Sequence, residues 1–357
     1  MTLNSETFLR LLSTGVKHGA SDIHFRPGSP PLSRVNKNLV PLKAEPLTPQ
    51  MTRAAARMIL ANRAEDLDDL HEVDTSYSLP GVARFRVSIY RQRSSIGLVL
   101  RIIPSRIRTI PELDLPPVLS EIALYERGLI LVSGATGSGK TTTLAAMLDH
   151  INDNRMGHIL TIEDPIEFLH NNKSCSVTQR EIGLDTKTFV TGMRAALRQD
   201  PDVILVGEMR DIESIDIGLK AAETGHVVFS TVHTTDAEKT IGRILAVFPP
   251  GEQHGVRLRL AESLRAVVSQ RLLPAADGKG MVLAAEVMIV TGTIREIIRD
   301  PSQGSIRDAI EAGGQHYHMQ SFDQHLTDLL RAGQISMGTA MSAATNPSDL
   351  QRNLSFG

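Results

Sequence analysis

The chain has 357 residues, enough for two or three domains, and its 41% hydrophobic and 22% charged residues are typical of a globular protein. A formal net charge of −2 provides no overall basic surface for nucleic acid. The single cysteine, Cys175, excludes an intrachain disulfide and a zinc site made of several thiolates. No apolar run approaches the length of a bilayer span, and no signal peptide is recognisable. We therefore expect a cytoplasmic protein that reaches a membrane only through a partner.

The first part of the chain alternates between helical and strand patterns. Apolar spacing predicts a helix within residues 1–20, and Thr48 followed by Pro49 predicts the N-cap and first turn of a second helix that ends near Ala61. Strands are expected at residues 21–25, in a hairpin over residues 32–42, and at residues 82–90 and 96–103. Together these elements predict a small α+β domain over residues 1–103.

A cluster of prolines follows this domain, at positions 104, 111, 116 and 117. Each proline fixes its φ angle and removes a backbone donor, which is typical of an extended connection. We therefore predict a linker over residues 104–117, with the domain boundary near residue 115.

Beyond the linker, β and α segments alternate as in a mostly parallel sheet covered by helices, which predicts an α/β core over residues 118–290. Strands are expected at residues 129–133, 159–162, 203–206, 227–231 and 282–288. The pattern becomes helical again over residues 291–357. Ligands of such sheets bind at the carboxyl ends of the strands, so the residues after each strand are the candidate site residues.

A glycine-rich loop follows the first strand of this core. Gly134, four residues, and then Gly139-Lys140-Thr141 fit the spacing of a phosphate-binding loop. Glycines let the loop curl so that its N–H groups point at phosphates, while Lys140 would reach the β- and γ-phosphates and the Thr141 hydroxyl would ligate Mg²⁺. A chance glycine turn rarely has a buried strand before it and a helical pattern after it. The predicted nucleoside triphosphate site consists of Gly134, Thr136, Gly137, Ser138, Gly139, Lys140, Thr141 and Thr142.

Polar side chains follow three further strands. Glu163 and Asp164, locked by Pro165, suit a Mg²⁺ site or the positioning of water; the alternative is the capped start of a helix. Glu208 could orient a metal's water shell or accept the proton of an attacking water, unless it is an ordinary surface carboxylate. His233 stands where a γ-phosphate sensor belongs, although a histidine at a strand end is more often a core or surface group.

Three arginines lie on predicted strands of the N-terminal domain. Arg84 and Arg86 alternate with apolar residues, and Arg101 interrupts the following strand. Such charges usually form a solvated sheet face. They could also act as arginine fingers on the triphosphate of a neighbouring subunit, because a flexible linker would allow that geometry in a ring.

Several motifs occur in an order that resembles one family. They are residues 133–148, the acidic stretch at residues 161–168, Gln179-Arg180-Glu181, Gly207-Glu208-Met209-Arg210-Asp211 and residues 222–234. From residue 20 to about residue 330, the chain resembles the type IV pilus retraction ATPases, the PilT and PilU group of the secretion ATPase superfamily.

The resemblance implies a PAS-like N-terminal domain, a RecA-like ATPase domain and a homo-hexamer with ATP and Mg²⁺ between subunits. It also implies that ATP hydrolysis turns a PilC-like platform protein at the cytoplasmic face of the inner membrane and shortens the pilus. A paralogous retraction ATPase is a further candidate partner. By this resemblance, Lys140 and Thr141 take the Walker A roles, Glu163 the Asp-box role, Glu208 the Walker B base and His233 the His-box role, and Arg84, Arg86 and Arg101 match the region that supplies arginines in trans.

The alternatives differ in direction and in class. Assembly and type II secretion ATPases usually carry further N-terminal domains and a four-cysteine zinc module, which favours retraction here. The Ala-Ile-Arg-Asn-Leu-Ile-Arg motif of PilT is changed at three positions in residues 293–299, and residues 177–186 are closer to PilU, so a principal or an accessory role stays open. A RecA-like nucleic-acid motor conflicts with the near-neutral charge and the 4% aromatic content. A scaffold that binds ATP without hydrolysis conflicts with Glu163 and Glu208.

Overall fold

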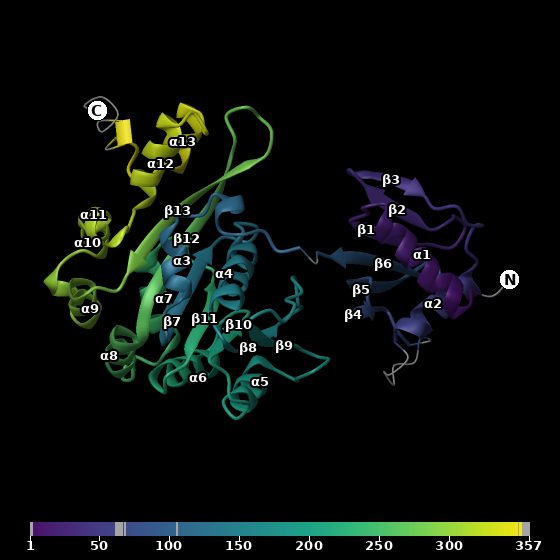
Figure 1. Ribbon diagram of the computed structural model, residues 1–357, viewed down its shortest axis with the longest axis horizontal. Helices are drawn as coiled ribbons and strands as arrows, with labels where there is room; N and C mark the ends of the chain where they lie inside the picture. Colours follow the sequence, from purple (N-terminus) through teal and green to yellow (C-terminus); the bar gives the residue numbers. More distant parts are fainter. Residues whose placement is uncertain (1–2, 61–66, 68, 105, 349, 352–357) are drawn as a thin grey trace. The chain divides into compact units, whose positions relative to one another are not determined.

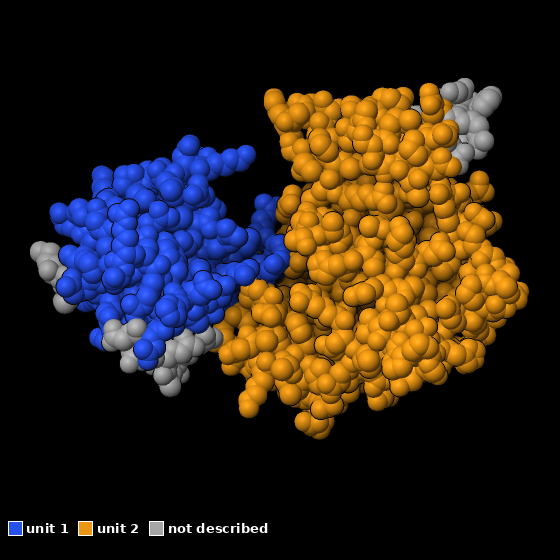
Figure 2. All heavy atoms as spheres, turned by 180° about the vertical axis from the view of Figure 1, so that it is seen from behind, with its two compact units in different colours: residues 1–106, 167–169 blue, residues 107–166, 170–357 orange. Residues whose placement is uncertain are grey.

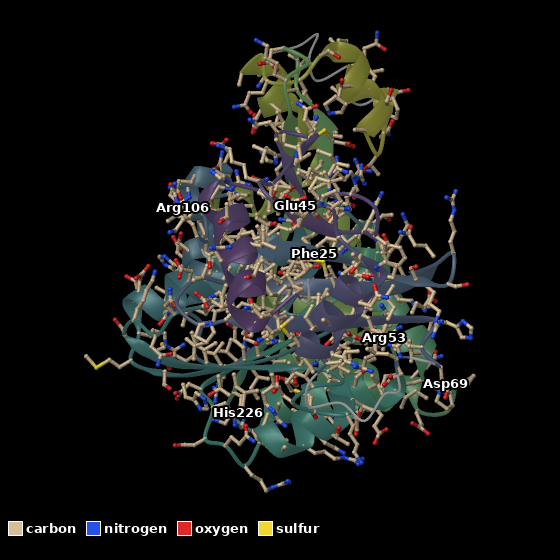
Figure 3. All side chains as sticks on the ribbon, turned by 90° about the vertical axis from the view of Figure 1, so that its right-hand side faces the viewer. Phe25, Glu45, Arg53, Asp69, Arg106 and His226 are labelled. Carbon is tan, nitrogen blue, oxygen red and sulfur yellow. The ribbon has the colours of Figure 1, made fainter. Side chains whose placement is uncertain are left out.

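The computed structural model describes residues 3–60, 67, 69–104, 106–348 and 350–351. The chain forms two compact units, residues 1–106 with 167–169 and residues 107–166 with 170–357 (Figure 2). Arg106, labelled in Figure 3, is therefore the last residue of the first unit before the chain enters the second. No helix in the described part of the chain is both long and apolar enough to cross a membrane.

The predicted linker over residues 104–117 is wrong from Ile107 onward, because the second unit begins at that residue and not near residue 115. Ile110 and Leu115 are buried in a hydrophobic cluster of the second unit. The prolines do not keep this segment extended, because Pro111 occupies the first turn of the short helix η1 (Pro111–Leu113) and Pro117 is the N-cap of α3 (Val118–Ala123). A missing N–H is no loss at these helix positions.

The first unit is a six-stranded sheet in the order β3-β2-β1-β6-β5-β4, with helices α1 and α2 packed on it (Figure 1). Every adjacent pair of strands is antiparallel. The elements are α1 (Ser5–Lys17), β1 (Asp22–Phe25), β2 (Leu32–Val35), β3 (Asn38–Pro41), α2 (Pro49–Ile59), β4 (Glu72–Leu79), β5 (Ala83–Gln92) and β6 (Ser95–Ile103). The sequence analysis missed β4, whose polar residues lie at the edge of the sheet.

Period-two patterning explains which face of this sheet is buried. Phe85 and Val87 on β5 are fully buried, and they belong to one cluster with Phe25 (Figure 3) and with residues of both helices. The hairpin between β2 and β3 turns at Asn36 and Lys37, which both have positive φ angles, as a two-residue hairpin requires. The predicted N-cap of α2 is confirmed, whereas its predicted end at residue 61 lies outside the described residues.

The second unit is a seven-stranded sheet in the order β13-β12-β7-β11-β10-β8-β9, in which only the β12–β13 pair is antiparallel. Its strands are β7 (Gly128–Gly134), β8 (Gly157–Glu163), β9 (Cys175–Glu181), β10 (Val203–Val206), β11 (Val227–Val232), β12 (Leu264–Pro274) and β13 (Met281–Ile289). The mostly parallel α/β sheet is thus confirmed. The predicted strands all exist, but β9 and β12 were missed.

Helices cover both faces of this sheet (Figure 1). α3 and α4 (Lys140–Asn154) pack on one face, and α5 (Phe189–Ala196), α6 (Ile212–Glu223), α7 (Ala237–Val247), α8 (Gln253–Ser263) and α9 (Gly292–Arg299) pack on the other. The chain continues through η2 (Pro301–Gln303), α10 (Ile306–Ala312), α11 (Gly314–Tyr317), α12 (Phe322–Arg331) and α13 (Met337–Ala343). α12 and α13 pack against the outer ends of β12 and β13, so the predicted C-terminal helical region belongs to the same compact unit.

Candidate functional site

The phosphate loop connects β7 to α4 in a conformation that requires glycine. Gly134, Gly137 and Gly139 have φ angles of 145°, 80° and 90°. Lys140 is the first residue of α4, and its Nζ donates to the carbonyl oxygens of Gly134 and Ala135 at 2.8 and 3.0 Å. The loop is therefore wrapped around its own ammonium group at the positive end of a helix dipole, the arrangement that binds phosphate.

The remaining predicted loop residues lie around this centre. Thr136 is exposed, and Thr141 and Thr142 are partly buried in the first turn of α4. The Ser138 hydroxyl is buried and has no hydrogen-bond partner among the described residues. An orphaned buried hydroxyl in such a loop indicates a polar ligand, because native proteins rarely leave such a group unsatisfied.

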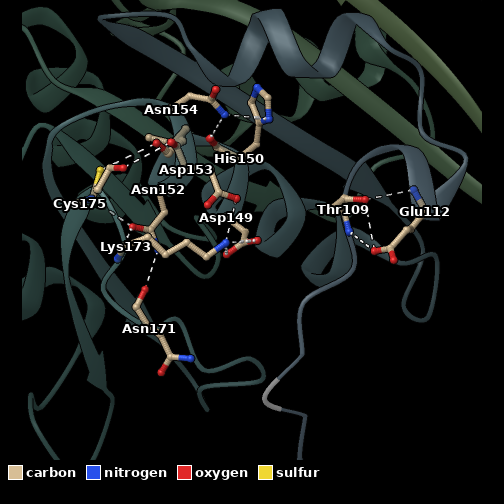
Figure 4. A network of polar contacts seen from close by, with 12 residues as sticks. Thr109, Glu112, Asp149, His150, Asn152, Asp153, Asn154, Asn171, Lys173 and Cys175 are labelled. Atoms are coloured by element: carbon tan, nitrogen blue, oxygen red, sulfur yellow. Dashed lines mark hydrogen bonds and ion pairs between the residues drawn. The ribbon is translucent and has the colours of Figure 1, made fainter.

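The far half of α4 is fixed by a polar network (Figure 4). Lys173 Nζ donates to Asp149 at 2.9 Å and to Asp153 at 2.8 Å. Asn152, fully buried, donates to the carbonyl oxygen of Asn171 at 2.7 Å and accepts from the amide of Cys175 at 3.2 Å. Residues 171–175, which lead into β9, therefore hold the C-terminal half of α4 in place. The phosphate loop, at the N-terminus of the same helix, is fixed as a result.

Glu163 stands at the carboxyl end of β8, and its position decides between the two alternatives for this stretch. Residues 164–174 form no helix, so the helix-cap alternative is wrong. The carboxylate is buried, and its Oε1 accepts from the Thr161 hydroxyl at 2.7 Å and from Gln179 Nε2 at 3.2 Å. Asp164, whose bond to Pro165 is cis, is exposed. Glu163 is therefore the oriented carboxylate of the pair.

The structure brings Glu208 and His233 together. Glu208 Oε2 lies 3.6 Å from His233 Nε2, and Glu208 Oε1 lies 2.5 Å from Arg210 Nη2. The backbone beneath them is fixed, because Gly207 donates to the Ile162 carbonyl at 2.8 Å and accepts from the Thr231 hydroxyl at 2.6 Å. Glu208 is thus an oriented carboxylate with a histidine and an arginine beside it, and not an ordinary surface carboxylate.

These residues share one edge of the sheet. In the register of β7, β11, β10 and β8, Ser133 pairs with Val232, and Val206 pairs with both Ser230 and Ile162. The loop of β7 and the residues after the other three strands therefore meet at the carboxyl edge. This edge presents a hydroxyl on α4 and two carboxylates, and such oxygen atoms are the ligands of hard cations.

The three arginines belong to the first unit, on one face of its sheet. Arg86 lies opposite Arg101 in the β5–β6 register, and Arg84 is two residues from Arg86 on the same strand. Arg84 donates to Ser76 and Ser78 at 2.8 and 3.2 Å. Arg101 pairs with Asp22 at 2.9 Å, whereas the side chain of exposed Arg86 makes no hydrogen bond or ion pair within the described ranges. Burial raises the pKa of Asp22, but the Ser21 hydroxyl and Arg101 lower it below its ordinary value.

A further carboxylate, that of Glu286, lies inside the second unit. Glu286 is in β13 and is buried, with Oε1 accepting from the Ala237 amide at 2.7 Å and from the Ser269 hydroxyl at 3.4 Å. Burial raises the pKa of Glu286 to about 7, and the nearby carboxylate of Asp236 adds to this rise. The Ala237 amide, the Ser269 hydroxyl and Arg271 act in the opposite direction.

Comparison with known proteins identifies the family. The family model described as type II/IV secretion system protein matches residues 6–291. This chain belongs to that family. It is 46% identical to the type IV pilus retraction ATPase PilT of Pseudomonas aeruginosa, over 94% of this chain and 98% of that protein. It is 39% identical to the type IV pilus ATPase PilU of the same organism, over 98% and 92%.

A solved structure supports the same assignment. The crystal structure of the pilus retraction motor PilT with bound ADP matches with a TM-score of 0.86 and 42% identity, over 96% of this chain and 98% of that one. The predicted resemblance and the predicted α/β architecture, an N-terminal domain followed by a RecA-like ATPase domain, are confirmed. As a member of this family, the chain is a nucleotide-binding ATPase.

The predicted site does not include the residues that support it from neighbouring elements. Arg210 belongs to the motif at residues 207–211, and a cation two residues after a strand-end glutamate is a usable sequence signal. Gln179 reaches Glu163 from β9, and Thr161 reaches it from two residues earlier on β8. Gln270, whose Nε2 donates to Thr143 at 2.7 Å, lies on the missed strand β12.

We expect the substitution Gly134→Ala to abolish tight nucleotide binding. The added Cβ would lie 2.4 Å from Ser138 Oγ and 2.6 Å from the Gln270 carbonyl oxygen, at a φ angle of 145°. The backbone carbonyl cannot rotate away, so the loop must open, and the affinity for a fluorescent ADP analogue should fall about 100-fold, equivalent to ~3 kcal/mol.

Gly225→Ala is the matched control, because Gly225 also has a positive φ angle but no atom within 4 Å of the added Cβ. It should lower the Tm by backbone strain while the affinity for the ADP analogue stays the same. Equal losses of affinity in the two variants would contradict the clash in the loop.

Glu286→Gln should stabilise the second unit, and more so at higher pH. The native carboxyl, with a pKa of about 7 against an ordinary 4.5, binds more protons in the folded than in the unfolded state between these values. Its favourable contribution is therefore complete below pH 4.5 and is lost as the pH rises through 7. The difference in unfolding free energy, variant minus native, should grow by up to about 3 kcal/mol between about pH 5 and about pH 8. Urea unfolding followed by circular dichroism measures it, and a difference independent of pH contradicts the shift.

Proposed function

We propose that this chain is the ATPase of a motor that hydrolyses ATP and thereby powers retraction of a type IV pilus. The observation that carries the proposal is the meeting of the phosphate loop with the Glu208–His233 pair at one sheet edge. This arrangement occurs in a chain that is 46% identical to PilT over 94% of its length. A phosphate loop alone binds nucleotides, whereas an oriented strand-end carboxylate adds the means of hydrolysis.

In this proposal each side chain has a defined task. The loop amides and Lys140 bind the phosphates, and the Glu208 carboxylate accepts the proton of the attacking water. His233 and Arg210 orient that carboxylate from two sides. Glu163 is held by Thr161 and Gln179 at the carboxyl end of β8, where its carboxylate would position water or metal.

The donor atoms at this edge fit Mg²⁺, which prefers oxygen ligands and keeps several waters. The Thr141 hydroxyl would hold it, with Glu163 and Glu208 reaching its water shell. When bound, Mg²⁺ neutralises charge on the β- and γ-phosphates. The protein residues supply the rest: they bind the nucleotide, hold the water and receive its proton.

The proposed assembly is a homo-hexamer in which the arginines complete the site of a neighbouring subunit. Arg86 supports this, because it is exposed and its side chain makes no polar contact within the described ranges. Arg84 and Arg101 are fixed by serines and by Asp22, and they would shape the surface around Arg86. The motor would act on an inner-membrane platform protein at the cytoplasmic base of the pilus, with a paralogous ATPase as a second partner.

We expect cells that carry Glu208→Gln in place of the native protein to display abundant surface pili and to lose twitching motility. The amide cannot accept the proton of water, so kcat should fall at least about 100-fold while ADP still binds. Pili are counted by electron microscopy, and motility is scored on agar. The control is Glu213→Gln on α6, which removes an exposed carboxylate paired with Arg194 of α5.

The other outcomes change the proposal. Cells without pili would show that this motor drives assembly. Normal pili with normal motility would show an accessory or redundant ATPase, and the higher identity to PilT than to PilU argues against that result.

Mixing defective subunits tests whether the arginines act in trans. A Lys140→Ala subunit cannot use its own site but still supplies Arg86, and an Arg86→Ala subunit has the converse defect. In an equal random mixture, half of the sites are intact and half of these face an arginine, so about one quarter of the native ATPase rate should return. A mixture of Lys140→Ala with Glu208→Gln should stay inactive, because both defects lie in the same site. No recovery in the first mixture contradicts the trans arrangement.

A further inference from the structure

A chain of hydrogen bonds runs from the strand before the phosphate loop to the start of α7. The Ser133 hydroxyl, next to Gly134, donates to the Ser269 hydroxyl at 3.0 Å. The Ser269 hydroxyl donates to Glu286 Oε1 at 3.4 Å, and the same oxygen accepts from the Ala237 amide at 2.7 Å. All three side chains are buried, so this chain crosses the core of the sheet and not its surface.

The backbone also connects Ser133 to the start of α7. Ser133 pairs with Val232 in the β7–β11 register, and only residues 233–236 separate Val232 from Ala237. These residues include His233, whose Nε2 lies 3.6 Å from Glu208 Oε2. The 233–236 loop is therefore held at its first end by the sheet and at its second end by Glu286.

A buried carboxylate at this place needs an explanation beyond packing, because an apolar side chain would fill the space without the cost of desolvation. The Ala237 amide is one of the first N–H groups of α7, which have no acceptor within the helix. Asp236 already caps the Lys239 amide at 2.8 Å. Glu286 adds an acceptor from another strand, and it thereby fixes the helix start relative to the sheet.

We propose that Glu286 is a positioning residue for hydrolysis: by holding the Ala237 amide it sets the 233–236 loop and so keeps His233 against Glu208. The inference rests on the proposed ATPase function. Glu286 does not contact the nucleotide in this view. It acts through the loop, and the Ser269–Ser133 link aligns that loop with the strand that carries the phosphate loop.

The test compares Glu286→Ala and Glu286→Gln with Val287→Ala in the full-length chain. Val287 is the next residue of β13 and is fully buried in the cluster on the other face of the sheet, so its substitution weakens β13 without touching α7. The measurements are kcat and KM for ATP, the affinity for a fluorescent ADP analogue, the Tm, and hydrogen exchange of peptides that cover residues 233–240.

Glu286→Ala should lower kcat about tenfold or more by misplacing His233, with KM and ADP affinity unchanged within about twofold. Exchange over residues 233–240 should rise. Glu286→Gln should restore both, because the amide oxygen still accepts from the Ala237 N–H. Val287→Ala should lower the Tm by several degrees but leave kcat and the exchange of this loop at native values.

Two results would overturn the proposal. One is a loss of kcat that follows the Tm equally in Glu286→Ala and Val287→Ala, which would make Glu286 a structural residue only. The other is unchanged hydrogen exchange over residues 233–240 in Glu286→Ala. A native protein without ATPase activity would refute the proposed function. The hydrogen exchange measurement does not need turnover, so it would still show whether Glu286 positions the 233–236 loop.

Discussion

The candidate site depends on the register of four parallel strands. Ser133 lies opposite Val232, and Val206 lies opposite Ser230 and Ile162, so the four strands end close to one edge of the sheet. The phosphate loop, His233, Glu208 and Glu163 therefore emerge along that edge. Helices cover both faces, and a slip of one residue would turn each of these side chains to the opposite face. The burial of both faces of the sheet therefore fixes the positions of the site residues at its edge.

Polar groups in the core then connect this edge to elements behind it. Asn152 and Lys173 fix the far half of α4 (Figure 4), and Gln270 reaches Thr143 near its start. Glu286 fixes the start of α7. Asn152, Gln270 and Glu286 are buried, and each is stabilised only in one arrangement of its partners, which favours a specific geometry over added stability.

The sequence was sufficient for the elements with strong local signals and insufficient for those defined by distant partners. The glycine spacing and the following helix located Lys140 without a structure. β12 was missed because α8 ends at Ser263 and the strand begins at the next residue, with no glycine or proline between them. The linker was overestimated because prolines favour helix starts as well as extended chain. The role of Arg210 depends on its contact with Glu208, and the role of Glu286 depends on its contact with Ala237. No local sequence pattern predicts either contact.

The balance of charge at the sheet edge argues for a site completed by a second subunit. Of the nitrogen-bearing side chains there, Arg210 and His233 already lie against Glu208, and Lys140 donates to the carbonyl oxygens of the phosphate loop. Phosphoryl transfer develops charge on the γ-phosphate oxygens, and an added arginine is worth several orders of magnitude in rate. Arg86 is exposed on a rigid strand, in a unit that ends at Arg106. A ring in which one subunit lends this arginine to the next would couple hydrolysis to movement between subunits, which is what a motor requires.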